Sequence, residues 1–337
     1  MASRNERPRV ALGIDLGATN LKLGLLRDAK IIAHTKIRTA DFEQPADAFR
    51  GAREFAKAEM RKAGLDPQSL ECVGLAMPGV IDDAGAVLME TANLHAWHGI
   101  RFHDELANVF QVPVAVINDA NAAALGESIF GRYQVDSLAL LTIGTGIGGG
   151  LITNGRAVGG KHGCGGEIGH MTIDYSNDAR LCGCGKTGHL EAYSGAAGIV
   201  QTAKELLAQA HQESSGASLL NSSVDFTPQQ IAEAAEDGDA IAKQTVQLTA
   251  IYLGRAISMV AHVTDPAVVL LGGAIHFGAN ETTTGREFLA RIRREVADRS
   301  LVQVGTQVTI DFATLGNDAG MLGAAEHARR DRLARNG

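Results

Sequence analysis

The sequence is poor in cysteine, with only 4 among its 337 residues. Two of these, Cys182 and Cys184, are too close in sequence to favour a disulfide with each other. Cys72 lies in an apolar run and is expected to be an ordinary buried strand residue. This usage argues against an oxidising compartment, and a reducing cytoplasm fits it best.

Positive charge is also scarce. The 31 Lys and Arg face 38 Asp and Glu, which gives a formal net charge of −7. A nucleic-acid partner usually requires a concentrated basic surface. The one dense basic run, residues 329–335, contains Asp331 and suits the last turn of a helix, where cations favour the helix dipole. The charge therefore argues against a nucleic-acid partner.

The sequence shows no sign of a membrane-spanning segment, a secretory leader or a P-loop. There is no uninterrupted apolar run long enough to cross a bilayer, and residues 1–9 do not resemble a secretory leader. The Gly-Lys-Thr sequence at residues 185–187 does not complete a P-loop, because Arg180 stands where that motif has its first glycine. We therefore expect no membrane partner. The 45% hydrophobic content is ample for a buried core that is split into two lobes.

Two segments repeat one pattern of apolar strand, tight turn of small residues and returning strand. They cover residues 10–26 and 138–153, and a third strand follows each of them, at residues 30–38 and 156–158. Helical and strand patterns then alternate in both halves. We therefore expect a duplicated α/β fold, in which two mixed sheets are flanked by helices and a cleft separates the halves.

The boundary between the lobes is expected near Asp119. The last helix is expected to return to the first lobe, so that the small lobe comprises residues 1–119 and 319–337 and the large lobe residues 120–318. The expected helices cover residues 45–63, 103–109, 240–262, 285–299 and 319–335, with a further helix starting at Thr227-Pro228, and the later strands cover residues 72–76, 114–118 and 268–272.

The run from Gly144 to Gly149 formally matches the dinucleotide-binding pattern G-x-G-x-x-G. That motif works only where a strand runs directly into a helix, whose N-terminus then meets the pyrophosphate. Here a hairpin with Asn154-Gly155 at its turn is predicted to follow. The sequence context therefore disfavours a dehydrogenase.

Both small-residue turns suit a phosphate cradle, because glycines let successive backbone N–H groups point toward anionic oxygens. Turns at Gly17 to Asn20 and Gly144 to Gly148 that face each other across a cleft would hold the polyphosphate of ATP. Asp15, at the mouth of the first turn, would hold Mg²⁺ through water. Each turn alone could be merely a tight connection, and it is the duplication that favours the phosphate interpretation.

Asp119 follows a predicted strand and begins a predicted helix. One interpretation is that it simply caps that helix, a common position for Asp. The other is that its carboxylate accepts a proton from a substrate hydroxyl, as phosphoryl transfer to an alcohol requires. The residues alone leave both roles of Asp119 open, and beside a base we expect Asn118 to orient another hydroxyl.

Four candidate soft-metal ligands lie in one short glycine-rich region: His170, Cys182, Cys184 and His189. Cys and His at such intervals suit tetrahedral Zn²⁺. The carboxylates of Glu167 and Glu191 lie within the same region and are good acceptors for the hydroxyls of a polyol. We therefore expect a metal site that holds hydrogen-bonding groups for a small-molecule ligand in place.

Two motifs, Gly166-Glu-Ile-Gly-His170 and Cys182-Gly-Cys-Gly-Lys-Thr-Gly-His-Leu-Glu191, resemble the signature of the ROK family of bacterial sugar kinases and sugar-responsive repressors. The resemblance runs from Asp15 to Gly323. Asn118-Asp119 matches the family's catalytic motif, and on this ground we favour Asp119 as the catalytic base over a helix cap. It implies an actin- or hexokinase-like (ribonuclease H-like) two-lobed fold with a zinc-binding insertion at about residues 164–191. It also implies ATP-dependent phosphorylation of a hexose, usually at the 6-hydroxyl, by a homodimer.

The family pattern assigns further residues to ligands. For ATP and Mg²⁺ these are Asp15, Gly17, Thr19, Asn20, Lys22, Gly144, Thr145, Gly146, Gly272 and Gly273. For the sugar they are Gly79, Asn93, Asn118, Asp119, Glu167, His170 and Glu191. The third thiolate of the family's metal motif is replaced here by His189, which changes the charge of the site, and Cys164 is a conceivable substitute ligand.

The sequence predicts the type of reaction more closely than it predicts the hexose that is phosphorylated. Glucose is the expected hexose, and kinases for fructose, mannose, N-acetylmannosamine and N-acetylglucosamine share most of these residues. A repressor of the same family would carry a helix-turn-helix module ahead of the first turn, and residues 1–9 are too short for one. A catalytically silent sugar-binding regulator would be expected to lack Asp15 or Asp119. We therefore expect a kinase.

Overall fold

The computed structural model describes residues 9–28, 30–81, 97–212, 218–220 and 225–335. By its internal contacts the chain divides into two compact units. The first comprises Met1–Asp136, Gly150–Gly166 and Thr314–Gly337, and the second comprises Ser137–Gly149 and Glu167–Ala313. Asp119, where the sequence analysis placed the lobe boundary, begins a helix within the first of these segments.

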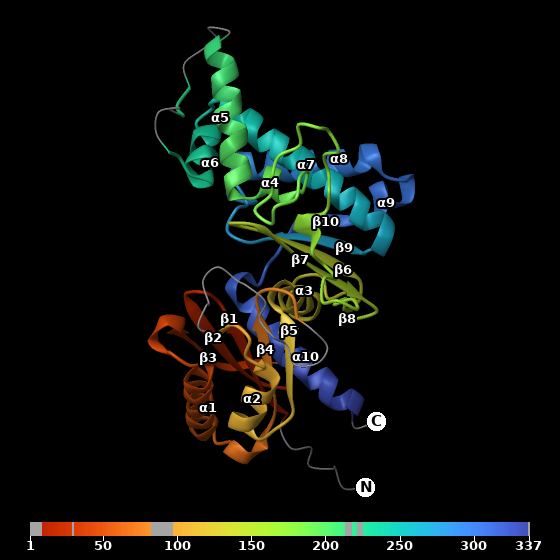
Figure 1. The fold of residues 1–337 in the computed structure, drawn as a ribbon. Helices are drawn as coiled ribbons and strands as arrows, with labels where there is room; N and C mark the ends of the chain where they lie inside the picture. The colour runs from red at the N-terminus through yellow and green to blue at the C-terminus, as the bar shows by residue number, and fades with distance from the viewer. Residues whose placement is uncertain (1–8, 29, 82–96, 213–217, 221–224, 336–337) are drawn as a thin grey trace. The chain divides into compact units, whose positions relative to one another are not determined.

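One five-stranded sheet has the order β3-β2-β1-β4-β5 (Figure 1). Its antiparallel meander consists of β1 (Val10–Leu16), β2 (Asn20–Arg27) and β3 (Lys30–Arg38). On the other side of β1, β4 (Leu70–Met77) and β5 (Val114–Asn118) are added in parallel. The carboxyl ends of the parallel strands therefore lie at one edge of this sheet, where β5 ends at Asn118.

The second sheet repeats this plan, with the order β10-β9-β6-β7-β8. Its strands are β6 (Leu138–Ile143), β7 (Ile147–Thr153), β8 (Arg156–Ala157), β9 (Val268–Gly272) and β10 (Thr309–Phe312). β9 pairs in parallel with both β6 and β10, while β7 and β8 are antiparallel. The strand order matches that of the first sheet when β1 to β5 are replaced by β6 to β10. The predicted duplication is confirmed.

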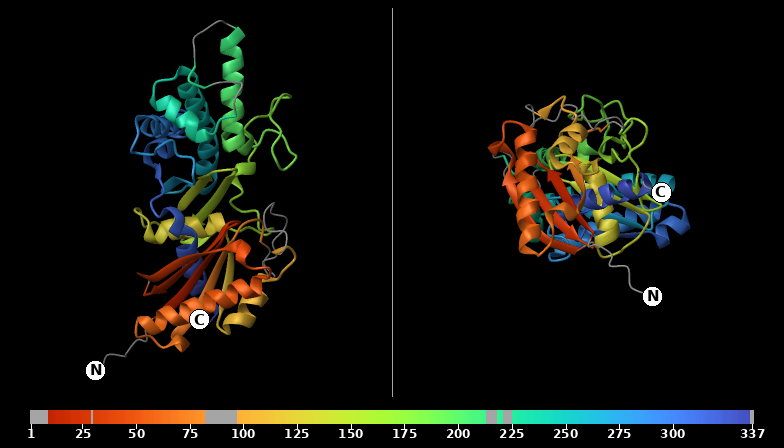
Figure 2. Two further views of the ribbon diagram at one scale, coloured as in Figure 1. Left: turned by 90° about the vertical axis from the view of Figure 1, so that its left-hand side faces the viewer. Right: turned by 90° about the horizontal axis from the view of Figure 1, so that it is seen from below.

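Both faces of the first sheet are covered by helices (Figure 2). Leu12 and Ile14 of β1 join one buried cluster with residues of α1 (Pro45–Lys62) and α2 (Phe102–Phe110). Ala11 points to the opposite face, where it joins a cluster with α10 (Ala319–Arg335). α10 also packs against α3 (Asp119–Phe130). Alternation of side chains along the strand thus produces a three-layer unit.

The second unit is rich in helix. Its helices are α4 (Glu191–Ser194), α5 (Ala196–Gln212), α6 (Pro228–Glu236), α7 (Ala240–Thr264), α8 (Thr283–Arg299) and α9 (Val302–Gln307). Thr227 and Gln230 form a capping box at the start of α6, where the sequence predicted a helix start. α8 begins two residues before the predicted Gly285, because Thr282 accepts a hydrogen bond from the Gly285 N–H as the N-cap.

Among the described residues, α7 is long and apolar enough to cross a membrane by length and composition alone. However, 56% of its most apolar window is buried inside the protein. It packs against α5, α6 and α8. α7 is therefore the central helix of the second unit's core.

Glu236, at the end of α6, binds the first turn of α8. Its carboxylate accepts hydrogen bonds from the backbone N–H groups of Thr283 (3.0 Å) and Thr284 (2.7 Å) and from the Thr284 hydroxyl (2.6 Å). These bonds, led by that of the Thr284 hydroxyl, lower the pKa of Glu236 from 4.5 to about 2. Because the folded pKa is depressed, this carboxylate stabilises the fold above pH 4.5, and the stabilisation is lost as the pH falls toward 2.

We therefore expect the melting temperature of the wild type to fall more steeply between pH 5 and pH 3 than that of Glu236→Gln, which lacks the titrating group. Thermal unfolding followed by circular dichroism at several pH values measures this difference. Glu233→Gln on the same helix is the control, and its pH dependence should follow the wild type. Parallel curves for the wild type and Glu236→Gln would contradict the assignment.

Candidate functional site

The predicted site residues are distributed over both units. The first unit carries Asp15, Gly17, Thr19, Asn20, Lys22, Gly79, Asn118 and Asp119, and the second carries Gly144, Thr145, Gly146, Glu167, His170, Cys182, Cys184, His189, Glu191, Gly272 and Gly273. Asn93 lies outside the described residues. The expected juxtaposition of the two glycine turns, which belong to different units, stays a prediction.

The first turn is the tip of the β1–β2 hairpin. Gly17 N–H donates to the Asn20 carbonyl (3.0 Å), which closes the turn. The buried Thr39 holds the turn from the side: its hydroxyl donates to the Gly17 carbonyl (2.7 Å) and its N–H to the Thr19 carbonyl (3.0 Å). A tip fixed in this way can present backbone groups to a ligand with little loss of entropy.

Asp15 lies at the mouth of this turn and forms an ion pair with Lys22 at 3.0 Å, across the strand pair in which the two residues are direct partners. Only 13% of the Asp15 side chain is exposed. Mg²⁺ dehydrates reluctantly and is usually bound through one or two carboxylates and several waters, and Asp15 supplies one carboxylate at the mouth of the turn. The donor chemistry therefore fits the predicted ion.

Asn118, Asp119 and Gly79 lie together at the end of β5. Asn118 is the true N-cap of α3, because its side-chain oxygen accepts from the Asn121 N–H (3.0 Å). Its side-chain amide donates to the Gly79 carbonyl (3.2 Å), which fixes the turn after β4. The half-buried Asp119 carboxylate accepts from the N–H of Ala120 (2.8 Å). Asn118 therefore supplies the cap that was considered as the alternative role of Asp119.

The second turn, Gly144 to Gly146, connects β6 to β7, so a strand and not a helix follows it. This excludes the dinucleotide-binding geometry. Glu191 reaches the turn from α4, where its carboxylate accepts from the Ile147 N–H (2.9 Å). A Cβ atom on Gly146 would lie 2.2 Å from that carboxylate, so a larger residue there would displace the Glu191 side chain. The turn and Glu191 therefore form one structure.

A cavity of about 510 Å³ opens beside this turn within the second unit. Gly144 and Thr145 line one part of it, the start of α6 at Thr227–Gln229 another, and the segment Ala274–Gly278 a third. This volume lies in the range of small-ligand sites and suits a nucleoside. Gly273, at φ +89°, lets the chain turn there from the end of β9.

Of the residues that line this cavity, only Gly144 and Thr145 were predicted from the sequence to bind a ligand. The helix start at Thr227-Pro228 was predicted, but nothing in its sequence indicated a ligand. Phe277 and Ala279 have positive φ values of 51° and 48°. Such strained backbone gathers at functional sites, and it becomes visible only in coordinates.

The four predicted metal ligands come together within the second unit. One ligand atom of each residue lies within 4.8 Å of all the others. Cys182 Sγ is 3.9 Å from His170 Nδ1, and Cys184 Sγ is 3.2 Å from His189 Nδ1. Ligand atoms of a tetrahedral zinc site are separated by about 3.3–3.8 Å. Among the described residues this group includes His189 and not Cys164.

The chemistry of the ligands fits a cation. Cys182 is buried, which raises the pKa of its thiol to about 11, and a thiolate there would need a divalent ion beside it. Burial and the neighbouring His170 lower the pKa of His189, so its imidazole stays in the neutral form that binds metals. The residues present therefore fit a structural zinc ion.

The sugar-side groups adjoin this cluster. His170 turns Nδ1 toward Cys182, and its Nε2 lies 3.9 Å from the Glu167 carboxylate. On the other side, the Cys182 thiol donates to Glu191 (3.6 Å). A bound metal would replace the thiol proton of Cys182, so it would fix His170 directly, Glu167 through His170, and Glu191 through the chain, two residues after the ligand His189.

Comparison with known proteins gives the same family throughout. The model of the ROK family matches residues 11–331. A glucokinase of Halalkalibacterium halodurans is 32% identical over 93% of this chain and 92% of its own length. A xylose repressor of Caldicellulosiruptor bescii is 26% identical over 96% of this chain and 79% of the repressor.

Two similar solved structures belong to the same family. A ROK hexokinase from Thermus thermophilus superposes with a TM-score of 0.78 and 29% identity, over 97% of this chain and all of the other. A ROK glucokinase from Streptomyces griseus, solved in complex with glucose and AMPPNP, gives 0.69 and 29% over 95% and 99% of the two chains. The predicted actin- and hexokinase-like fold is confirmed.

Proposed function

Because this chain belongs to the ROK family and is an ATP-dependent sugar kinase, we propose that it transfers the γ-phosphoryl group of ATP to the 6-hydroxyl of glucose. The glucokinase relatives support glucose as the hexose. The single structural observation that carries the proposal is the half-buried carboxylate of Asp119 at the carboxyl end of β5, with the helix cap supplied by Asn118.

Asp119 is the proposed general base. It takes the proton of the 6-hydroxyl while that oxygen forms a bond to the γ-phosphorus, and the bond between the γ-phosphorus and the bridging oxygen breaks to release ADP. Asn118 holds the Gly79 turn beside Asp119. When bound, Mg²⁺ would offset the phosphate charge, and Asp15 is its proposed holder through water.

The second unit contributes the other groups of this proposal. The Gly144 and Ile147 N–H groups already donate to the Gly146 carbonyl and to Glu191, so in this proposal Thr145 and Gly146 present their N–H groups to phosphate. The cavity beside the turn takes the adenosine. Glu167, His170 and Glu191 accept hydroxyls of the sugar. We propose that the four-ligand cluster holds a structural Zn²⁺ that keeps these three side chains in position, with no part in the transfer itself.

An assay of ADP release across a panel of sugars tests the proposal. We expect kcat/KM for glucose to exceed that for fructose, mannose, N-acetylmannosamine and N-acetylglucosamine by about 10-fold or more, the discrimination that one substituent commonly gives. A second assay, coupled to glucose 6-phosphate dehydrogenase, should report the same rate as ADP release, because that enzyme detects only the 6-phosphate.

Two results would contradict this proposal. A faster rate with another hexose would replace glucose as the substrate and leave the kinase in place. The repressor relatives favour a second candidate, a sugar-responsive regulator. That candidate predicts calorimetric binding of a sugar, with xylose included in the panel, and no release of ADP with any of them.

A further inference from the structure

We propose that Arg180 is a positioning residue, which fixes the metal loop (residues 170–190) to α4 and α5 and so holds the sugar-side carboxylate of Glu191 in place. Arg180 contacts neither of the proposed substrates in this scheme. The inference rests on the proposed function for its consequence on sugar binding, whereas its consequence on metal binding is independent of it.

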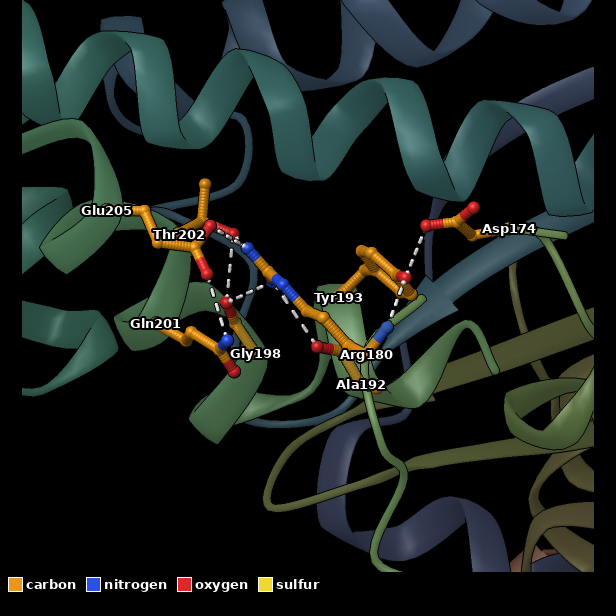
Figure 3. Close-up of polar contacts among 8 residues, drawn as sticks. All are labelled: Asp174, Arg180, Ala192, Tyr193, Gly198, Gln201, Thr202 and Glu205. Atoms are coloured by element: carbon orange, nitrogen blue, oxygen red, sulfur yellow. Dashed lines mark hydrogen bonds and ion pairs between the residues drawn. The ribbon is translucent and has the colours of Figure 1, made fainter. Parts of the chain in front are cut away.

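The guanidinium of Arg180 connects the metal loop, which carries it, to the helices α4 and α5 (Figure 3). One nitrogen donates to the carbonyls of Ala192 in α4 (3.3 Å) and Gly198 in α5 (3.1 Å) and to the hydroxyl of Thr202 (3.0 Å). The other terminal nitrogen binds the carboxylate of Glu205 at 2.6 Å. Only 12% of the Arg180 side chain is exposed. A largely buried guanidinium with several partners is more rigid than a single surface ion pair.

The backbone of Arg180 is held as well. Its N–H donates to the hydroxyl of Tyr193 (2.8 Å), and its carbonyl accepts from the Gly188 N–H (2.9 Å). The Tyr193 hydroxyl in turn donates to Asp174 (2.6 Å). Burial and this bond raise the pKa of Tyr193 to about 12, so the phenol remains a donor. The guanidinium also lies 4.9 Å from the Tyr193 ring centre.

This network matters because α4 is a single turn of four residues and cannot fix its own orientation. Its carbonyl groups have few partners within the helix, and Arg180 supplies one for Ala192, the residue after Glu191. Glu191 reaches the Ile147 N–H from this short helix. Loss of the guanidinium would therefore loosen Glu191 and the ligand Cys182, two residues beyond Arg180, together.

The test compares purified wild type with Arg180→Ala, Arg180→Lys and Tyr193→Phe. We expect the zinc content of Arg180→Ala, measured by mass spectrometry after dialysis against a weak chelator, to fall well below that of the wild type. Its KM and calorimetric Kd for glucose should rise about 10- to 100-fold, as for other groups that orient metal ligands. Its KM for ATP should stay within about twofold, a split that general unfolding would not produce.

The other two variants keep the test decisive if Arg180→Ala does not fold. Lysine cannot reproduce the fork of donors, so Arg180→Lys should resemble Arg180→Ala more than the wild type. Tyr193→Phe, which removes one hydroxyl only, should shift zinc content and glucose affinity in the same direction. Lys204→Ala is the matched control, because this cation of α5 contacts Asp225 and Phe226 instead of the metal loop. It should behave as the wild type.

Normal zinc content and normal glucose affinity in folded Arg180→Ala would overturn the inference. The same result in both Arg180→Lys and Tyr193→Phe would overturn it if Arg180→Ala does not fold. If the wild type phosphorylates no hexose, the proposed function fails, and the zinc measurement then decides the role of Arg180 alone.

Discussion

Replacing Asp119 by Asn is expected to lower kcat by about 10²- to 10⁴-fold, the usual contribution of a positioned general base. The affinity for glucose should stay within a few-fold of the wild type, because the amide keeps the shape of the carboxylate and can still accept a hydrogen bond from a hydroxyl. Steady-state rates of ADP release give kcat, and calorimetry with glucose in the absence of ATP gives the affinity.

The structure indicates that this substitution changes the charge of residue 119 and keeps the hydrogen bonds described around it. The side-chain cap of α3 comes from Asn118, so the substitution leaves that cap in place. The bond that Asp119 accepts from the Ala120 N–H can be kept by the oxygen of an amide. We therefore expect the melting temperature to change little, and a loss of rate would report on chemistry.

Asp47→Asn is the matched control, since it removes one negative charge from an exposed position of α1. Its kcat should equal that of the wild type. If Asp119→Asn retained most of its turnover, Asp119 would not be the base, and the mechanism proposed here would have to assign proton removal to another group.

The second large effect concerns the metal. We expect the wild type to contain about one equivalent of zinc and Cys182→Ser about none, because a buried hydroxyl cannot replace a thiolate in a Cys₂His₂ set. KM for glucose should rise about 10- to 100-fold with the loss of the metal, since it would hold Glu191 and His170. Metal analysis of the purified protein and hexose kinetics measure both.

Two further variants separate the metal site from general effects of cysteine loss. Cys164 is exposed and is not part of the ligand group, so Cys164→Ser should keep its zinc and its glucose affinity. His189→Cys restores the three thiolates of the family pattern and should bind zinc at least as well as the wild type. His189→Ala should lose it.

Zinc retained at one equivalent in Cys182→Ser would contradict the assignment of the ligands. A wild type without bound metal, purified without chelator and still fully active, would contradict the structural role of zinc. Loss of metal from Cys164→Ser would show that the fourth ligand is Cys164 instead of His189.

The sequence predicts this fold well wherever the signal is local. The β3 strand and the start of α6 follow directly from turn chemistry and from the Thr227-Pro228 cap, and both lie where they were predicted. The repeated strand-turn-strand pattern predicts the neighbouring strands β1 to β3 and β6 to β8 that each sheet contains. These features depend on neighbours in sequence, so they can be derived from the sequence alone.

Features that depend on distant residues were not predicted. Nothing near Asn118 announces that its amide binds Gly79, 39 residues away. The nucleoside-sized cavity takes its walls from three separate segments. Arg180 looks like an ordinary loop cation in the sequence, and its importance appears only when α4 and α5 are placed around it. These contacts form only through tertiary packing, so a local sequence pattern does not reveal them.

The dependence of the first sheet on α10 has a consequence for synthesis on the ribosome. α10 covers one face of that sheet through Leu322, Ala325 and Ala328, yet it is made about 200 residues after β5. At a usual elongation rate this delay lasts about 10–40 s. For that period the nascent sheet has a bare apolar face, which makes the unfinished chain a natural client for ribosome-associated chaperones.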